Sequence, residues 1–166
     1  ELEPTGYITA AGLPSITPFE EGKPSHHTQL YSRDGVDMTL LKSELFVPPV
    51  LGKTFGDEIL DWTENHGVED VAVLEGISFR HGPEGHQTYY VATDDYRETR
   101  LTDVEVTPMG RGFLDGVNGA LVERGIESSL GVGVYITPVH DLMPDVEAAI
   151  RLVETVNDVY DIGVDT

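Results

Sequence analysis

A helix that leads directly into an apolar strand occurs twice in this sequence. The first helical segment ends at Gly67 before the run Val71 to Ile77, and the second ends at Gly125 before Leu130 to Thr137. A glycine just past a helix supplies the left-handed turn that ends it. A nearly continuous apolar run is typical of a strand covered on both faces. These returns predict an α/β fold, a three-layer sandwich with a mainly parallel or mixed sheet.

Shorter segments complete the predicted sheet, and the early ones form an antiparallel portion: Tyr7 to Ala10, Thr28 to Ser32, Val36 to Val47 and Thr88 to Thr93. Thr54 is suited to cap the first helix. Pro144 opens a final helix whose apolar residues form one stripe: Val146, Ala149, Ile150, Val153, Val156 and Tyr160. No linker or second core is visible. We therefore expect residues 1–166 to form a single domain.

The chain is strongly acidic, with 30 Asp and Glu against 10 Lys and Arg and a net charge of −20. Its hydrophobic content of 39% is too high for a disordered acidic chain, so the acids belong on a folded surface. Lysine is scarcer than arginine, which favours a protein from a salt-filled cytoplasm, where the Debye length falls to about 3 Å at 1 M and repulsion among the acids is screened. An ordinary acidic surface is the alternative interpretation. Without a basic stripe, binding to nucleic acid is not expected.

Two absences in the composition exclude further classes of protein. The sequence has no cysteine, which excludes disulfides, thiolate nucleophiles and cysteine-ligated zinc or iron–sulfur sites. No apolar run approaches the roughly 20 residues that a membrane span needs. We therefore expect a soluble, cytoplasmic protein without a membrane partner.

The segment from Pro108 to Gly125 is rich in glycine and resembles a nucleotide-binding loop. Its glycines are Gly110, Gly112, Gly116 and Gly119, a spacing different from the G-x-G-x-x-G that suits a pyrophosphate. It also lacks the lysine of a P-loop. The favoured interpretation is structural: the first two glycines form a turn, and the last two allow the helix to pack closely on the sheet.

A ligand site nevertheless remains the alternative interpretation of this region. Glu75 lies at the carboxyl end of an apolar strand, where ligands gather in open α/β sheets. Arg111 has the fork geometry to bind an anion, and Asn118 could orient a base or ribose. Together with Gly110 and Gly112, these residues form the candidate ligand-binding set.

Histidines and serines are weaker candidates for chemistry. His81 and His86 lie five residues apart in a loop, and the adjacent pair His26 and His27 points to opposite faces of an extended segment. No G-x-S-x-G elbow surrounds Ser78. We therefore predict no metal site, no cofactor and no catalytic residue.

Several motifs, taken together in their order along the chain, resemble an archaeal member of the proteasome assembly chaperone 2 family. They are the run Phe46 to Pro49, the helix end His66 to Val68, the strand Val73 to Ile77, the segment Gly112 to Leu121 and the ending Tyr160 to Thr166. The resemblance covers nearly the whole chain. It implies a fold akin to the phosphorylase/hydrolase type and a role in assembling 20S proteasome α subunits, without catalysis.

The resemblance has two departures. Family members usually have a strand and a glycine-rich Leu-Pro-Gly turn before the part that resembles Glu1 to Ile8, and they often continue past the position of Asp165 and Thr166 into a further helix. The resemblance leads us to expect that both segments are missing from the sequence given. Some archaeal relatives also dock through a terminal triplet of a hydrophobic residue, tyrosine and any residue. Val159, Tyr160 and Asp161 have that composition without the terminal position, so we expect them to end the last helix.

Three hypotheses for function follow, the third being a purely structural oligomer that associates with itself and has no partner. The first is a non-enzymatic assembly chaperone that binds proteasome α subunits or a related partner and forms a homo-oligomer. The alternative is a phosphorylase-like or hydrolase-like enzyme acting on a nucleoside-type small molecule through Glu75, Arg111 and Asn118.

Overall fold

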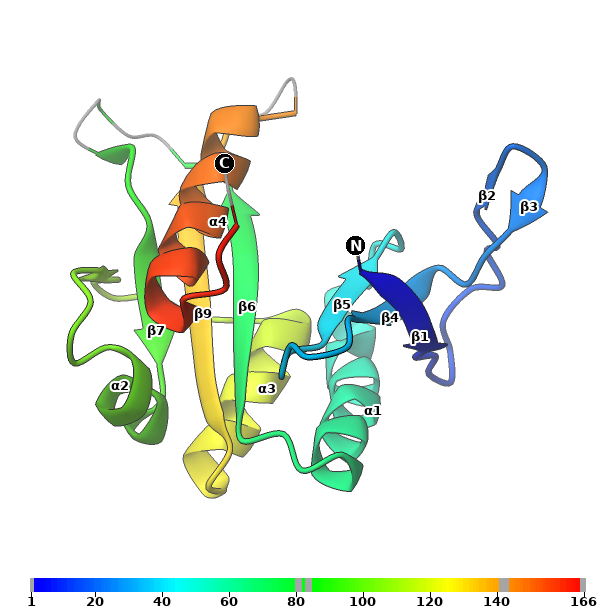
Figure 1. The fold of residues 1–166 in the computed structure, drawn as a ribbon, viewed down its shortest axis with the longest axis horizontal. Coiled ribbons are helices and arrows are strands. Elements are labelled where there is room, and N and C mark those ends of the chain that lie inside the picture. Colours follow the sequence, from blue (N-terminus) through cyan, green and yellow to red (C-terminus); the bar gives the residue numbers. More distant parts are fainter. Residues whose placement is uncertain (1, 80–81, 83–84, 141–143, 165–166) are drawn as a thin grey trace. The chain divides into compact units, whose positions relative to one another are not determined.

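Two units make up the chain in the computed structural model, which describes residues 2–79, 82, 85–140 and 144–164 (Figure 1). The first unit comprises Glu1–His66 and Asp115–Ala120. The second comprises Gly67–Leu114 and Leu121–Thr166. The boundary therefore falls within one helix, α3 (Gly116–Glu127).

An antiparallel sheet forms the first unit's strand layer, in the order β1 (Glu3–Tyr7), β4 (Thr28–Ser32) and β5 (Leu40–Ser43). The predicted strand at Thr28 to Ser32 and the antiparallel character of the early strands are confirmed. The first strand lies earlier than predicted. The predicted strand over residues 36–47 is reduced to β5, because a turn with Gly35 at φ 81° precedes it.

A small hairpin extends from the same unit, formed by β2 (Phe19–Glu20) and β3 (Lys23–Pro24). The two residues between these strands, Glu21 and Gly22, both have positive φ, at 48° and 78°. Positive φ at both central positions is the geometry of a type I′ turn, whose twist matches that of a hairpin.

Helix α1 (Gly52–Asn65) follows a short 3₁₀ turn, η1 (Pro49–Leu51). Thr54 lies inside the first turn, so the prediction that it caps the helix is wrong. Gly67, at φ 64°, follows the helix end as predicted. The inward face is apolar and includes Phe55, Ile59 and Leu60, all buried.

Two glycines bring α1 and the start of α3 into close contact. A Cβ atom on Gly52 would overlap the backbone of Gly116, and one on Gly56 would lie 2.9 Å from the Ala120 Cβ. Gly116 itself adopts φ 58°, a conformation that favours glycine. Gly116 thus serves close packing as predicted, but its neighbour is a helix of the first unit and not the sheet.

A mixed four-stranded sheet forms the second unit, in the order β6 (Asp70–Ile77), β9 (Gly131–Pro138), β7 (Tyr89–Ala92) and β8 (Thr107–Pro108). The β6–β9 and β7–β8 pairs are parallel, and the β7–β9 pair is antiparallel. Every residue of β9 is buried, whereas β6 is half-buried. The strand covered on both faces is therefore β9. The prediction that Val71 to Ile77 is such a strand is wrong, because the Leu74 side chain of β6 is 44% exposed.

Helices lie on both faces of this sheet. On one face, Tyr96 of α2 (Asp94–Arg100) covers Gly133 of β9. Figure 1 shows α4 (Val146–Tyr160) crossing a face of the same strands. On the other face, Gly125 of α3 packs closely on Val132. Gly125 lies within α3 and does not end it, and α2 occupies a stretch between Thr93 and Pro108 for which no helix was predicted.

The final helix α4 is rotated relative to the predicted stripe. Val146 and Ile150 are 65% and 39% exposed, while Ala148 and Leu152 are buried against the sheet. Asp145 caps the helix, because its Oδ1 accepts a hydrogen bond of 2.9 Å from the Ala148 N–H. The predicted stripe is therefore right toward the end of the helix, where Val156 and Tyr160 pack against the core, and wrong at its start, where Val146 and Ile150 are exposed.

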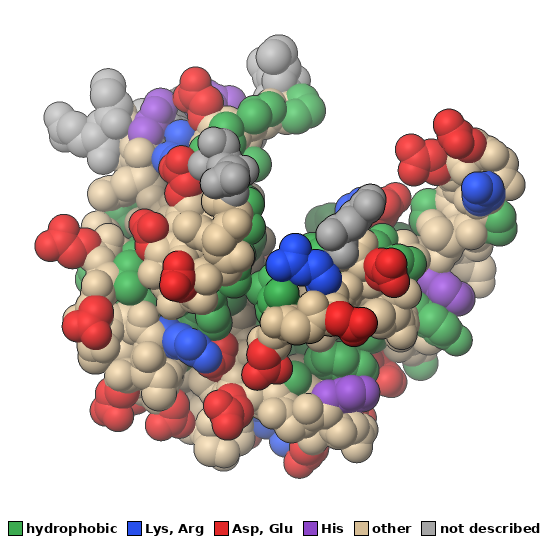
Figure 2. Space-filling model, in the orientation of Figure 1, with side chains coloured by type: hydrophobic (Ala, Val, Ile, Leu, Met, Phe, Trp, Pro, Cys, Tyr) green, Lys and Arg blue, Asp and Glu red, His purple; other side chains and the backbone are tan. Residues whose placement is uncertain are grey.

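The described residues thus form a mixed α/β fold with two antiparallel sheets, one of them the β2–β3 hairpin, and one mixed sheet. Figure 2 shows acidic side chains scattered over the visible face of each unit, with few basic side chains among them. This distribution agrees with the expectation that the chain's acids lie on a folded surface.

Candidate functional site

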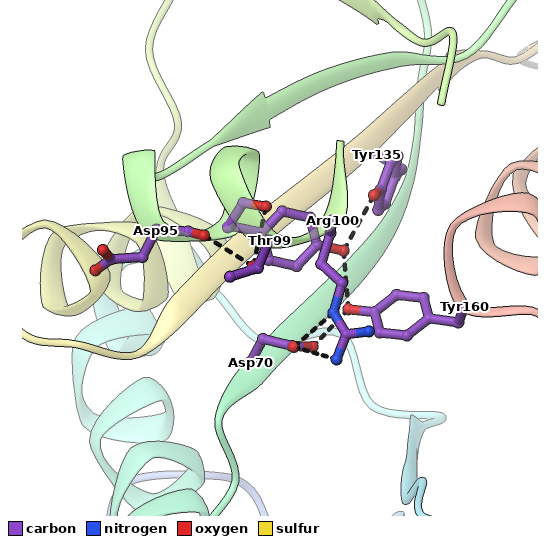
Figure 3. Close-up of polar contacts among 7 residues, drawn as sticks. Asp70, Asp95, Thr99, Arg100, Tyr135 and Tyr160 are labelled. Atoms are coloured by element: carbon purple, nitrogen blue, oxygen red, sulfur yellow. Dashed lines mark hydrogen bonds and ion pairs between the residues drawn. The ribbon is translucent and has the colours of Figure 1, made fainter. Parts of the chain in front are cut away.

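A buried chain of tyrosine hydroxyls is the main polar feature of the second unit (Figure 3). The Tyr96 hydroxyl lies 3.0 Å from that of Tyr135 and 2.9 Å from that of Tyr160. Tyr160 in turn donates to Oδ1 of Asp70 at 2.6 Å. The chain ends at Arg100, whose Nε lies 2.8 Å from Asp70 Oδ2 and whose Nη2 lies 2.7 Å from the same oxygen.

The direction of every hydrogen bond in this network follows from the number of protons. Each phenol carries one donor hydrogen, and Tyr160 uses its own on Asp70. Tyr96 must therefore donate to Tyr160, and Tyr135 must donate to Tyr96. The hydroxyls form a chain that points toward the carboxylate, an arrangement in which each bond polarises the next.

Burial sets the protonation of this network. Tyr96 and Tyr135 are fully buried, and burial is the main cause that raises the pKa of each phenol well above its usual range. Burial likewise raises the pKa of Tyr160, with the hydrogen bond to Asp70 as the second cause. All three phenols are therefore neutral at physiological pH and unsuited to act as bases.

The opposite end of the network is held by charge. The hydrogen bond to Asp70 is the main cause that raises the pKa of the Arg100 guanidinium, so this group stays charged. Its Cζ also lies 4.7 Å from the centroid of the Tyr160 ring, within the range of a cation–π contact. The network joins residues of β6, α2, β9 and α4, so its role is to hold these elements together.

The network also determines the state of the triplet Val159, Tyr160 and Asp161. Helix α4 ends at Tyr160, and Asp161 follows in a left-handed conformation at φ 51°. The Tyr160 side chain is bonded to Asp70 and Tyr96. The expectation that this triplet ends the last helix is confirmed.

The predicted ligand-binding residues are spread over different parts of the chain. Glu75 lies half-buried on β6. Gly110, Arg111 and Gly112 form an exposed loop after β8, and a Cβ atom on either glycine would meet open space. Asn118 lies half-buried in α3, in the first unit, whereas the other four lie in the second. The structure does not establish a site shared by all five.

The histidines are placed in several unrelated contacts. His26 stacks on Tyr7 with ring centroids 3.6 Å apart, and His66 stacks on Trp62 at 4.3 Å. The His140 Nδ1 lies 2.7 Å from Asp145, beside the start of α4. His81 lies outside the described residues. Within the described part of the chain, no group of three or more histidine or acidic side chains is placed to hold a metal ion.

Sequence reasoning did not identify Asp70, Tyr96, Arg100 and Tyr135 as a cluster. One signal was present: Tyr135 is a polar aromatic residue in the middle of an otherwise apolar strand, and a buried tyrosine hydroxyl usually needs a partner. The partners come from positions up to 90 residues apart, as for Asp70 and Tyr160. Such long-range partners leave no local pattern in the sequence.

None of the helices that the structure describes is long and apolar enough to cross a membrane. No curated protein matches the sequence.

Solved structures share the fold of this chain. A protein of unknown function from Thermoplasma acidophilum matches with a TM-score of 0.88 and 18% identity, covering 99% of this chain and 67% of that one. PbaA of Pyrococcus furiosus, an archaeal homolog of proteasome-assembly chaperone, matches at 0.85 and 20% identity, covering 99% and 68%. PbaB of the same organism, an archaeal proteasome activator, matches at 0.70 and 14% identity, covering 91% and 69%.

Sequence identities this low show that these proteins share a fold with the chain and no more. The family is shown instead by a comparison of the sequence with a family model. The model of the PAC2 family matches residues 1–166, and the chain therefore belongs to the PAC2 family.

Proposed function

We propose that this protein is a proteasome-assembly chaperone that binds 20S proteasome α subunits. The observation that carries the proposal is the family match over residues 1–166. The fold likeness to PbaA, an archaeal homolog of proteasome-assembly chaperone, supports it. The family assignment also confirms the expectation of a non-enzymatic protein, because the family is homologous to proteasome-assembly chaperones, which are not enzymes.

The distribution of polar and apolar groups supports action through surfaces. The second unit uses its buried polar side chains in an internal network, and its phenols are neutral. Large apolar side chains lie exposed instead, among them Phe46 at 79%, Val50 at 86% and Phe113 at 103%. Apolar groups exposed together mark surfaces that bind other proteins. Phe46 and Val50 flank the proline pair of the first unit and make that segment a candidate contact.

Binding through the Val159 to Asp161 triplet is not part of the proposal. The Tyr160 hydroxyl is committed to Asp70 and Tyr96, so its release would break the network that holds α4. We propose that the partner binds the body of the protein.

The test is reconstitution with purified α subunits in molar KCl. Native gel electrophoresis and light scattering are expected to show a discrete complex and faster assembly of α-subunit rings. Poly-glutamate of matched charge is the control, because a surface at −20 could bind a basic protein without specificity. A paired Phe46→Ser and Val50→Ser variant is expected to weaken the complex. The proposal fails if the wild-type protein neither binds α subunits nor changes their assembly beyond the effect of poly-glutamate.

Four further statements about the protein go beyond its family assignment. We propose that the protein forms a homo-oligomer, comes from an archaeal halophile and works in the cytoplasm. A nucleoside-type ligand bound by Glu75, Arg111, Asn118 and the glycines at 110 and 112 also stays a prediction. A thermal-shift screen with nucleosides and phosphate tests it, since a shift that Arg111→Ala abolishes would support the site. No shift with any of these ligands would count against it.

A further inference from the structure

The loop Gly110–Phe113 presents an unusual pair of side chains to solvent. Met109 anchors its start, because the Met109 N–H donates to the Tyr90 carbonyl at 2.8 Å. Beyond that bond the glycines have open space around them, and Arg111 is exposed. Phe113 is 103% exposed, so the whole ring meets water. Aromatic and arginine side chains are the types enriched in protein interfaces.

The loop and its immediate neighbours in the sequence, between Glu105 and Asp115, differ in charge from the rest of the chain. Residues 106–114 contain no acidic side chain and one arginine, in a chain with 30 acidic residues. Two copies at −20 repel each other wherever acids face acids. The loop is therefore a place where a second copy can approach with attraction instead of repulsion.

A shallow depression in the same unit has the complementary character. It encloses about 350 Å³ and is lined by residues of β7, of α2 and of the turn after α2: Tyr90, Asp94, Arg97, Glu98, Leu101 and Thr102. Tyr90 and Leu101 supply apolar surface, and two carboxylates lie at its rim. The Asp94 side chain is 92% exposed and lies 3.6 Å from Arg97, a surface ion pair that contributes little and leaves the carboxylate open to a second cation.

We propose that the Gly110–Phe113 loop of one copy binds the α2 depression of a second copy. The Phe113 ring enters between Tyr90 and Leu101, and the Arg111 guanidinium pairs with the carboxylates of Asp94 and Glu98. Loop and depression are neighbours on one unit, since Met109 is bonded to Tyr90. A two-fold axis beside them therefore allows each copy to insert its loop into the other, which forms the contact twice and closes the dimer.

This interface deepens the homo-oligomer proposal and is independent of binding to proteasome subunits. The test is sedimentation equilibrium of the full chain in molar KCl. Wild type is expected to dimerise, and Phe113→Ser and Arg111→Glu are each expected to raise the dimer dissociation constant by roughly tenfold or more, as loss of an interface anchor does. Glu98→Arg is expected to act likewise. Combined with Arg111→Glu, it is expected to restore dimerisation, because the exchanged charges attract again.

Matched controls come from α3 of the same molecule. Ile126→Ser removes another exposed apolar side chain, 74% exposed, and Arg124→Glu reverses another exposed charge on the same helix. Neither is expected to change the dissociation constant. A monomeric wild type overturns both the interface and the homo-oligomer proposal. The interface alone is overturned if the wild type forms an oligomer whose dissociation constant Phe113→Ser leaves unchanged. It is also overturned if the double variant Arg111→Glu with Glu98→Arg does not restore dimerisation.

A photo-crosslinking side chain in place of Phe113 identifies what the loop touches. Crosslinks to residues of α2 in a second copy are expected. Crosslinks to an α subunit, or to any protein other than a second copy, overturn the assignment of this surface to self-association.

Discussion

Gly133→Ala is expected to destabilise the second unit through a single steric conflict. An alanine Cβ at this position of β9 would lie 2.6 Å from Cζ of Tyr96 and 2.9 Å from Cδ1, whereas ordinary contacts of such an atom are 3.4–4 Å. The ring cannot withdraw easily, because Tyr96 is 0% exposed and its hydroxyl is bonded on both sides. The methyl group therefore forces strain into the strand, the ring or the hydroxyl chain.

The magnitude follows from two opposing terms. Overpacking a well-packed core costs about 1–3 kcal/mol, and the fixed ring places this site near the upper end. Replacing a strand glycine by alanine returns about 0.5–1 kcal/mol. The net loss in the free energy of unfolding is therefore about 2 kcal/mol. For a chain of this length, such a loss lowers Tm by roughly 4–8 °C.

Urea unfolding in molar KCl measures this loss, with near-UV circular dichroism of the tyrosines as the signal. Gly131→Ala is the matched control on the same strand, since its Cβ would lie 3.2 Å from the Asp70 Cβ and 3.5 Å from the Tyr96 Cα. We expect the control to lose less than about 1 kcal/mol. In a Tyr96→Leu background, alanine at position 133 is expected to cost nothing. The steric argument is refuted if Gly133→Ala unfolds within about 0.5 kcal/mol of wild type, or if both glycine variants lose equally.

Three further perturbations test the network, the helix cap and the acidic surface. Tyr160→Phe removes the hydrogen bond to the Asp70 carboxylate and is expected to cost about 1.5–3 kcal/mol in urea unfolding; an unchanged midpoint would contradict this. The buried phenols have raised pKa values in the folded state, so their contribution is complete below the unfolded pKa of about 10 and is lost as pH rises above it. Ultraviolet titration should therefore show three tyrosines that ionise only with unfolding. The Ala148 backbone hydrogen bond, followed by His140, lowers the pKa of Asp145 to about 2, so its contribution is present above about pH 4 and is lost as pH falls through about 2. Asp145→Asn, which keeps an acceptor for the cap, should abolish this acid-dependent step of α4 unfolding, and an unchanged acid profile would count against it. Raising KCl from 0.1 to about 2 M should increase Tm, because salt screens the repulsion of a chain at −20; a constant or falling Tm would disprove a halophilic surface.

Local patterns predicted the elements whose character depends on their own residues. The apolar runs that end at Ile77 and Thr137 correspond to β6 and β9. The strand at Thr28 to Ser32 has the predicted bounds. Prediction failed where the outcome depended on neighbours. The inward face of α4 is set by contact with the Tyr96 and Tyr135 cluster, and Leu152 could join that cluster only if Val146 and Ile150 turned outward.

The glycine segment separates the two kinds of information most clearly. Its sequence excluded a standard dinucleotide or P-loop spacing and predicted a turn followed by a closely packed helix. Only the tertiary structure showed that Gly116 packs on α1 while Gly125 packs on Val132, and that the loop between 110 and 113 is exposed. Val132 is close to Gly125 in the sequence, but Gly125 also packs on Thr93, more than thirty residues away, and Gly116 packs on Gly52, more than sixty residues away. No local pattern in the sequence records these two distant contacts.

The sequence by itself determined the class of the fold, the acidic surface, the absence of cysteine chemistry and the family, because these depend on composition, local periodicity and the order of motifs. The tertiary structure decided the pairing order β6-β9-β7-β8, the burial of β9 and the hydroxyl chain from Tyr135 to Asp70. These features arise when distant segments exclude water from one another, and a buried hydroxyl must then take whatever partner the packing brings to it.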